Sequence, residues 1–220
     1  MTDVARATSE RGEIVLRKRG AVWELRVNGV FVMDTAETGS EIELARAALA
    51  LADAPRDVLV GGLGLGFTAH EVLSDTRVER LVVVEIEDAL IGWMRDGTVP
   101  YGPTYLADER LTVANADIRN AVAEAPDDSF DLVLLDVDNG PDFLVYDENA
   151  QVYEADFLAG VRRVLRGGGA LVVWSASETT ALQDTMAHVF GNCEAIPHPV
   201  QLQTRDETYW LYLSRRGEDR

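Results

Sequence analysis

Three glycines in the first half of the chain suggest a turn that a ligand can approach closely. Gly62, Gly64 and Gly66 follow a short apolar run and precede a predicted helix. Without side chains they let the chain turn sharply and let a ligand touch the backbone, and the free N–H groups of the helix start point at that ligand. The next apolar run ends in Glu85, where a carboxylate accepts hydrogen bonds from ribose hydroxyls. This spacing predicts a nucleoside site, although the glycines alone are also typical of a strand–helix turn that binds nothing.

Two further acidic residues close later apolar runs and favour the nucleoside site. Asp117 follows the run at 111–114 and could accept a hydrogen bond from an adenine amino group, and Asp136 follows the run at 130–135. In open α/β sheets such strand ends meet at one edge, which is where ligands bind. Asp136 could orient an amine, or accept its proton while the nitrogen attacks an electrophilic carbon. Its other interpretation is a cap or turn residue at the strand end.

The elements that must position these residues alternate regularly along the chain. Strands are expected near 57–61, 80–85, 110–115, 130–136 and 169–175. Helices are expected near 66–74, 87–95, 118–125, 153–166 and 178–190. Right-handed crossovers turn this order into a doubly wound α/β sheet that is mostly parallel. Short apolar runs at 193–196 and 209–213 add an antiparallel pair at its edge, which makes seven strands.

The residues before this sheet predict a small antiparallel β unit. They alternate apolar and polar side chains as far as Asp34, with a turn dipeptide at Asn28-Gly29. Ser40 and Glu43 then form an S-x-x-E capping box at the start of a helix. We therefore expect two parts, which are the N-terminal β unit over 1–35 and the sheet domain over 36–220.

Composition limits the kinds of partner and the expected cellular compartment. The chain has 220 residues, of which 47% are hydrophobic, and a formal net charge of -18. This negative charge repels nucleic acid and favours a small neutral or cationic substrate, although a requirement for solubility alone also explains the charge. The single Cys193 cannot form an internal disulfide, and three histidines show no metal-ligand spacing, so no metal is expected. We expect a cytoplasmic protein without a membrane span, and exposed β edges that could pair in a homodimer.

Segments spread over nearly the whole chain carry a resemblance to one known family. They are VNGVFVMDTAE, the glycine loop with TAHEVL, VVVEIEDALI, ADIRNAV, DLVLLDVDNGP and YEADFLAGVRRVLRGGGALVV. These segments resemble the spermidine synthase family within the class I S-adenosylmethionine-dependent transferases, whose methyltransferase fold is Rossmann-like. The resemblance implies a sulfonium nucleoside cofactor, held by the residues that follow. These are Gly62, Gly64, Leu65 and Gly66 under the methionine-like tail, Glu85 with Ile86 at the ribose, Asp117 with Ile118 around the adenine, and Asp136 at the reaction centre.

Three positions depart from the motifs of that family. Its glycine loop typically reads G-G-G-D-G-G, and Leu65 stands where the aspartate would hold the amine of a decarboxylated cofactor. A leucine cannot balance an ammonium, and leaving that charge unpaired in a closed site costs on the order of several kcal/mol. Of the Tyr-His-Glu element of the polyamine pocket only Glu43 remains. The D-x-x-D of the catalytic loop becomes Asp136-Val137-Asp138-Asn139, which keeps the first acid and moves or loses the second.

The remaining substrate candidates lie in the loop from Asp136 to Tyr153. Asp138, Asn139, Tyr146 and Tyr153 could contact a substrate, together with Glu43. The acids and the amide beside Gly140-Pro141 are equally typical of an ordinary turn, and tyrosines are equally typical of core packing.

These residues support three functional hypotheses. The leading one is a transferase that uses intact S-adenosylmethionine, most simply for methyl transfer to a small amine or other small nucleophile, because a carboxylate suits exposed glycine N–H groups. The second is aminopropyl transfer from decarboxylated S-adenosylmethionine, which is spermidine synthase activity. The third is a nucleoside-binding protein without catalysis.

Overall fold

Five parallel strands form the centre of a seven-stranded sheet in the computed structural model, which describes residues 2–202 and 205–218. The sheet order is β10-β11-β9-β8-β5-β6-β7. The parallel strands are β5 (Asp57–Gly61), β6 (Arg80–Glu85), β7 (Leu111–Asn115), β8 (Phe130–Leu135) and β9 (Leu165–Ser175). At one side of the sheet, the edge strand β10 (Glu194–Leu202) runs antiparallel to its neighbour β11 (Arg205–Arg215), and β11 runs antiparallel to β9. The predicted doubly wound, mostly parallel sheet is thus confirmed.

The central strands are buried on both faces, which explains why they are nearly continuous apolar runs. Alternate residues of β5 and β8 join two different core clusters: Val60 and Leu134 face one, while Leu59 and Val133 face the other. Each such side chain contributes about 1.5–3 kcal/mol by leaving water. The helices that cover the sheet are α1 (Gly39–Leu51), α2 (Phe67–Ser74), α3 (Asp88–Asp96), α5 (Ile118–Glu124), α6 (Ala155–Val164) and α7 (Thr180–Phe190).

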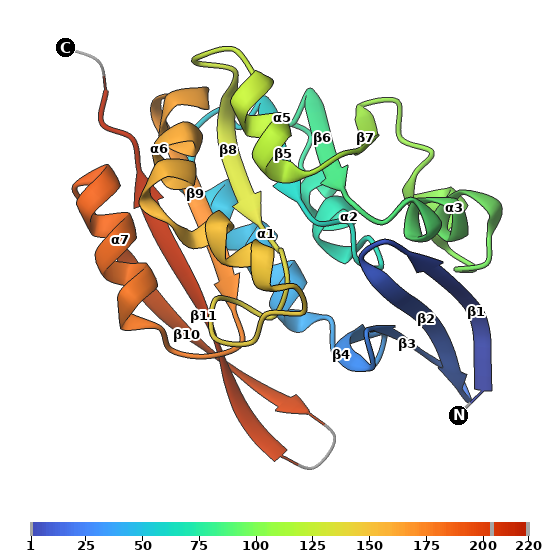
Figure 1. Ribbon diagram of the computed structural model, residues 1–220. Coiled ribbons are helices and arrows are strands. Elements are labelled where there is room, and N and C mark those ends of the chain that lie inside the picture. The colour runs from blue at the N-terminus through green and yellow to red at the C-terminus, as the bar shows by residue number, and fades with distance from the viewer. Residues whose placement is uncertain (1, 203–204, 219–220) are drawn as a thin grey trace.

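A second, four-stranded antiparallel sheet lies beside the carboxyl ends of the parallel strands (Figure 1). Its strands are β1 (Thr2–Ser9), β2 (Gly12–Arg19), β3 (Val22–Val27) and β4 (Val30–Asp34). Asn28 and Gly29 both have positive φ, 51° and 78°, so they form the predicted hairpin turn. Leu16, Leu25 and Met33 pack into the same core cluster as the main sheet. This sheet therefore forms one wall of whatever lies at the strand ends.

Several local predictions were wrong for identifiable reasons. Strand β1 was missed because its side chains are mostly exposed and polar, and the short elements α4 (Gly102–Tyr105) and η1 (Asp147–Tyr153) have no clear periodicity. Thr38 occupies the N-cap of α1, without a side-chain cap, so Ser40 and Glu43 do not form a capping box. Ser40 lies inside the helix instead, where its hydroxyl donates to Glu41.

The residues that the structure describes were searched for membrane-spanning helices and for metal-binding groups. None of the helices there is long and apolar enough to cross a membrane. In the same ranges, the acidic, histidine and cysteine side chains do not gather in a group that could hold a metal ion.

Candidate active site

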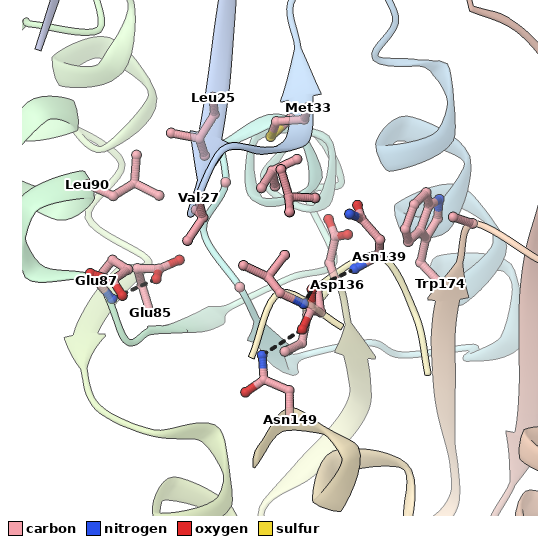
Figure 2. A pocket seen from close by; sticks show the side chains of 18 of the residues that line it. Leu25, Val27, Met33, Glu85, Glu87, Leu90, Asp136, Asn139, Asn149 and Trp174 are labelled. Atoms are coloured by element: carbon pink, nitrogen blue, oxygen red, sulfur yellow. Dashed lines mark hydrogen bonds between the residues drawn. The ribbon is translucent and has the colours of Figure 1, made fainter. Parts of the chain in front are cut away.

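A cavity of about 470 Å³ opens at the carboxyl edge of the main sheet, between the strand ends and the small N-terminal sheet (Figure 2). Its walls include apolar side chains from both sheets and an unusual number of acids. Nine lining residues are carboxylic acids, namely Asp34, Glu37, Glu41, Glu85, Glu87, Asp117, Asp136, Asp138 and Glu207. Across the described ranges, 2–202 and 205–218, the lining contains no Lys, Arg or His. The cavity is therefore electrostatically suited to a cation.

The glycine loop is shaped by close backbone contacts. Gly62 has φ +97°, and a Cβ built there would lie 2.1 Å from the carbonyl oxygen of Asp136. Gly64 has φ +50°, and its Cβ would lie 2.7 Å from Sδ of Met33. No other residue type fits either position without a shift of the backbone or of that methionine. Both glycines line the cavity, whereas the lining does not include Leu65 or Gly66.

Most N–H groups of this loop donate hydrogen bonds inside the protein. Gly62 donates to the carbonyl of Val84, and Leu63 donates to Oε2 of Glu85, both at 2.9 Å. Leu65 N lies 3.1 Å from the sulfur of Met33, and Gly66 donates to the carbonyl of Leu63. The expectation of exposed glycine amides is therefore wrong for Gly62 and Gly66. Without free amides there, the loop offers much less to a carboxylate than the sequence suggested.

Glu85 forms the centre of one end of the cavity. Its side chain is buried, and its two carboxylate oxygens accept hydrogen bonds from the N–H groups of Leu63 and Glu87, at 2.9 and 2.8 Å. Burial raises the pKa of Glu85, and these backbone hydrogen bonds act in the opposite direction. Each oxygen keeps a further lone pair. The fixed carboxylate can thus accept from a vicinal pair of hydroxyl groups, and Ile86 lies beside it in the lining.

Arg11, from the turn between β1 and β2, supports this end of the cavity from the N-terminal sheet. Its guanidinium lies 4.1 Å from the ring centroid of Tyr146 and its Nε lies 3.7 Å from Oε1 of Glu87. The Tyr146 hydroxyl donates to the same oxygen of Glu87 at 3.1 Å. Sequence reasoning missed Arg11, because one arginine in a polar turn carries no pattern.

Asp117 and Ile118 also line the cavity, at the start of α5. Asp117 caps this helix by accepting from the N–H of Arg119, and it forms an ion pair with the Arg119 guanidinium at 2.5 Å. The side-chain hydrogen bond from Arg119 is the main reason that the pKa of Asp117 is lowered. Asp117 therefore caps the helix with its side chain and also lines the cavity.

Asp136 and Glu41 form the second acidic centre of the cavity. Asp136 follows β8 and accepts a hydrogen bond from Oγ1 of Thr68 at 2.8 Å, and burial raises its pKa to about 6. Glu41 lies in the first turn of α1, where it is 9% exposed and accepts from the Ser40 hydroxyl at 2.7 Å. Burial, and then the nearby charge of Asp136, raise the pKa of Glu41 to about 7.

Glu41 takes the place that the sequence assigned to Glu43. Glu43 is not among the residues that line the cavity. Two residues along an α-helix correspond to a rotation of about 200°, so a helix that turns Glu41 toward the cavity turns Glu43 away from it. The choice of Glu43 from the motif letters therefore selected a side of the helix that does not line the cavity.

The loop after Asp136 is organised by its own polar residues. Asp138 accepts from the backbone N–H of Val145 at 2.6 Å and from the side-chain amide of Asn149 at 2.9 Å. Asn139 donates to the carbonyl of Phe31 at 3.2 Å, which ties this loop to β4. Both residues line the cavity, as does Tyr146.

Tyr153 does not belong to this cavity. It is buried, and its hydroxyl donates to the carbonyl of Val137. The expected substrate contact is therefore wrong, because the buried phenol satisfies its hydrogen-bonding group within the core. Trp174 and Tyr209 form an aromatic wall instead, with their rings 4.9 Å apart in a T-shaped contact.

Fold and site together place the protein among the class I methyltransferase-like α/β proteins, with a glycine turn and an acidic cavity at the carboxyl edge of the sheet. The family model described as the spermine/spermidine synthase domain matches residues 39–202. The chain belongs to this family.

Individual relatives agree with this assignment and differ in their activities. The polyamine aminopropyltransferase of Aeropyrum pernix is 28% identical over 202 residues, which cover 83% of this chain and 63% of that protein. Putrescine N-methyltransferase 2 of Nicotiana tabacum is 28% identical over 145 residues, which cover 64% and 38%. The spermidine synthase structure from Thermotoga maritima superimposes with a TM-score of 0.83 at 16% identity, covering 99% of this chain and 74% of that one. The chain spans less than two thirds of the length of either of the two curated relatives, the aminopropyltransferase and the N-methyltransferase.

Proposed function

We propose that the protein is an aminopropyltransferase, which transfers the aminopropyl group of decarboxylated S-adenosylmethionine to a small amine. The observation that carries this proposal is the charge of the cavity, whose described lining includes nine carboxylic acids and no basic side chain. Both substrates of such a reaction are cationic. An intact S-adenosylmethionine would add its own carboxylate to these acids, which costs free energy unless a donor pairs with it.

The nucleoside part of the donor fits one end of the cavity. Glu85 is held there by two backbone N–H groups and retains acceptor capacity for ribose hydroxyls. The apolar side chains of Ile86 and Ile118 would border the base, beside Asp117. When bound, this donor supplies an electrophilic carbon next to a sulfonium, so the protein needs no nucleophile of its own.

Asp136 lies where the acceptor amine is expected. Its carboxylate would orient the nitrogen and accept the proton released as the nitrogen bonds to carbon and the sulfur leaves with the electron pair. Burial raises the pKa of Asp136 toward the range in which a base works near neutral pH. The hydrogen bond from Thr68 fixes the direction of the carboxylate.

Methyl transfer from intact S-adenosylmethionine is the second candidate. Leu65 favours it, because the loop lacks an acid for the donor ammonium, and the likeness to putrescine N-methyltransferases supports it. In the structure its main argument is weaker, since four loop N–H groups already donate within the protein. The same cavity serves both reactions, and only the tail of the donor differs.

Turnover assays with each donor distinguish these candidates. The purified protein is incubated with putrescine and either decarboxylated or intact S-adenosylmethionine, and the products are separated by mass spectrometry. We expect an aminopropylated diamine and 5'-methylthioadenosine from the decarboxylated donor. In the Asp136→Asn variant turnover should fall by about a hundredfold or more, because removing a general base costs that much. Methylated product would overturn the proposal in favour of methyl transfer, and nucleoside binding without any product would favour a non-catalytic protein.

A further inference from the structure

The glycine loop of this chain contains no acid that could pair with a cationic tail. Leu65 stands at the position in question and is fully buried in the core cluster, and it does not line the cavity. Four of the loop N–H groups are occupied by Val84, Glu85, Met33 and Leu63. A bound ammonium must therefore find its carboxylate on another element.

Glu41 is the carboxylate that the fold brings to this end of the cavity. It projects from the first turn of α1, which a short link over 35–38 joins to β4, the strand whose Met33 contacts the glycine loop. It lies close enough to Asp136 for the two charges to interact, and Asp136 in turn approaches Gly62 through its backbone carbonyl. Figure 2 shows Met33, Asp136 and Asn139 around the same part of the cavity.

The groups around Glu41 are other acids and one histidine, His198, whose Nε2 would lie 3.8 Å from a Cβ built on Gly39 at the start of the same helix. Glu37 precedes the helix, Asp136 faces Glu41 from the end of β8, and Tyr209 and Glu207 lie on β11. The Glu41 carboxylate accepts from the Ser40 hydroxyl at 2.7 Å and from its own backbone N–H. Two buried carboxylates without a cation repel each other, and a cation between them removes that repulsion.

We propose that Glu41 binds the terminal ammonium group of the aminopropyl donor, from helix α1 and in place of an acid in the glycine loop. This inference rests on the proposed function and makes Glu41 a specificity-determining residue. A donor that carries a carboxylate beside its amine would bring a third carboxylate to the Glu41–Asp136 pair. Glu41 would therefore favour the decarboxylated donor over the intact one.

The test compares three ligands that share the nucleoside and differ in the tail. Binding of decarboxylated S-adenosylmethionine, intact S-adenosylmethionine and 5'-methylthioadenosine, a neutral thioether that lacks both the amine and the sulfonium charge, is measured by titration calorimetry at pH 8. The proteins are the wild type, Glu41→Gln and the control Glu43→Gln, which alters the same helix outside the cavity. Chemical denaturation of each variant verifies that it is folded.

In Glu41→Gln the affinity for decarboxylated S-adenosylmethionine should fall about tenfold or more, which is typical for loss of a charge-assisted hydrogen bond. The affinity for 5'-methylthioadenosine should change less than about threefold, and intact S-adenosylmethionine should bind no worse than before. Glu43→Gln should resemble the wild type with all three ligands.

Equal losses for decarboxylated S-adenosylmethionine and 5'-methylthioadenosine would overturn the inference, because Glu41 would then act on the fold of the site and not on the ammonium. An unchanged affinity for the decarboxylated donor would overturn it too, while turnover by the wild type would leave the proposed function standing. A wild type that binds 5'-methylthioadenosine as tightly as the decarboxylated donor and forms no product would refute both.

Discussion

Replacing Glu41 by glutamine should stabilise the free protein, and by more at pH 8 than at pH 5.5. Burial and the charge of Asp136 raise the pKa of Glu41 to about 7, from an ordinary value of 4.5. A carboxyl whose pKa is higher in the folded state binds its proton more tightly there. The stability that the more tightly bound proton of Glu41 contributes is fully present below the pKa of Glu41 in the unfolded chain. It is lost as the pH rises through the pKa of Glu41 in the folded protein. A neutral glutamine does not lose it.

The magnitude follows from the two pKa values. A shift from 4.5 to about 7 corresponds to about 3 kcal/mol once Glu41 is fully ionised in both states. Part of this penalty already exists at pH 5.5, where the unfolded chain is ionised, and about 2 kcal/mol more develops between pH 5.5 and pH 8. Gln keeps an acceptor for the Ser40 hydroxyl, so the comparison mainly reports the charge.

Urea denaturation, followed by tryptophan fluorescence, measures this difference at both pH values. Urea is preferable to guanidinium chloride, because the latter is a salt and screens the charges in question. The control is Glu43→Gln, which alters the same helix outside the cavity. If the gain from Glu41→Gln is equal at pH 5.5 and pH 8, or larger at pH 5.5, Glu41 is not a buried acid beside Asp136.

Three further substitutions test the rest of the site. Gly62→Ala places a Cβ 2.1 Å from the Asp136 carbonyl oxygen at φ +97°, so the free energy of unfolding should fall by about 2 kcal/mol or more. The control is Gly92→Ala in helix α3, where the added Cβ meets open space and the change should be neutral or stabilising. Glu85→Gln turns an amide N–H₂ toward a backbone N–H, so 5'-methylthioadenosine should bind at least about tenfold more weakly in calorimetry, with a stability loss of about 1–3 kcal/mol. Arg11→Ala removes the guanidinium beside Tyr146 and Glu87, so nucleoside affinity should fall while the denaturation midpoint changes little. Unchanged affinity in either of the last two variants would exclude that residue from the nucleoside end.

The main sheet could be predicted because its strands are buried on both faces. Such strands leave short apolar runs between helices, and the predicted limits at 57–61 and 80–85 agree with β5 and β6. Elements without that signal were lost or misplaced. The mostly exposed strand β1 has almost no apolar face, and β9 begins at Leu165, although a helix was expected as far as 166 and a strand only from 169.

Part of the site was predictable for the same topological reason. In a parallel sheet all carboxyl ends meet at one edge, so Gly62, Glu85, Asp117 and Asp136 come together however far apart they lie in the sequence. Residues that reach this edge from elsewhere do not follow the rule. Glu41 comes from a helix whose orientation the sequence did not determine to within two residues, and Arg11 comes from a hairpin turn of the other sheet.

One physical constraint explains both the leucine at position 65 and the acid at position 41. An aspartate at position 65 would need water or a cation, but the backbone places this side chain in the core with no exposed surface, where a leucine is stabilised by about 1.5–3 kcal/mol through burial. With an apolar residue there, the sharp turn at Gly62 and Gly64 is held by packing and by the contact of Leu65 with Met33. The acid can then lie on α1, where Glu41 lines the same cavity as Asp136 and interacts with its charge. Loss of the acid from the glycine loop is therefore compatible with a cationic donor, provided that Glu41 is free to ionise when the ammonium binds.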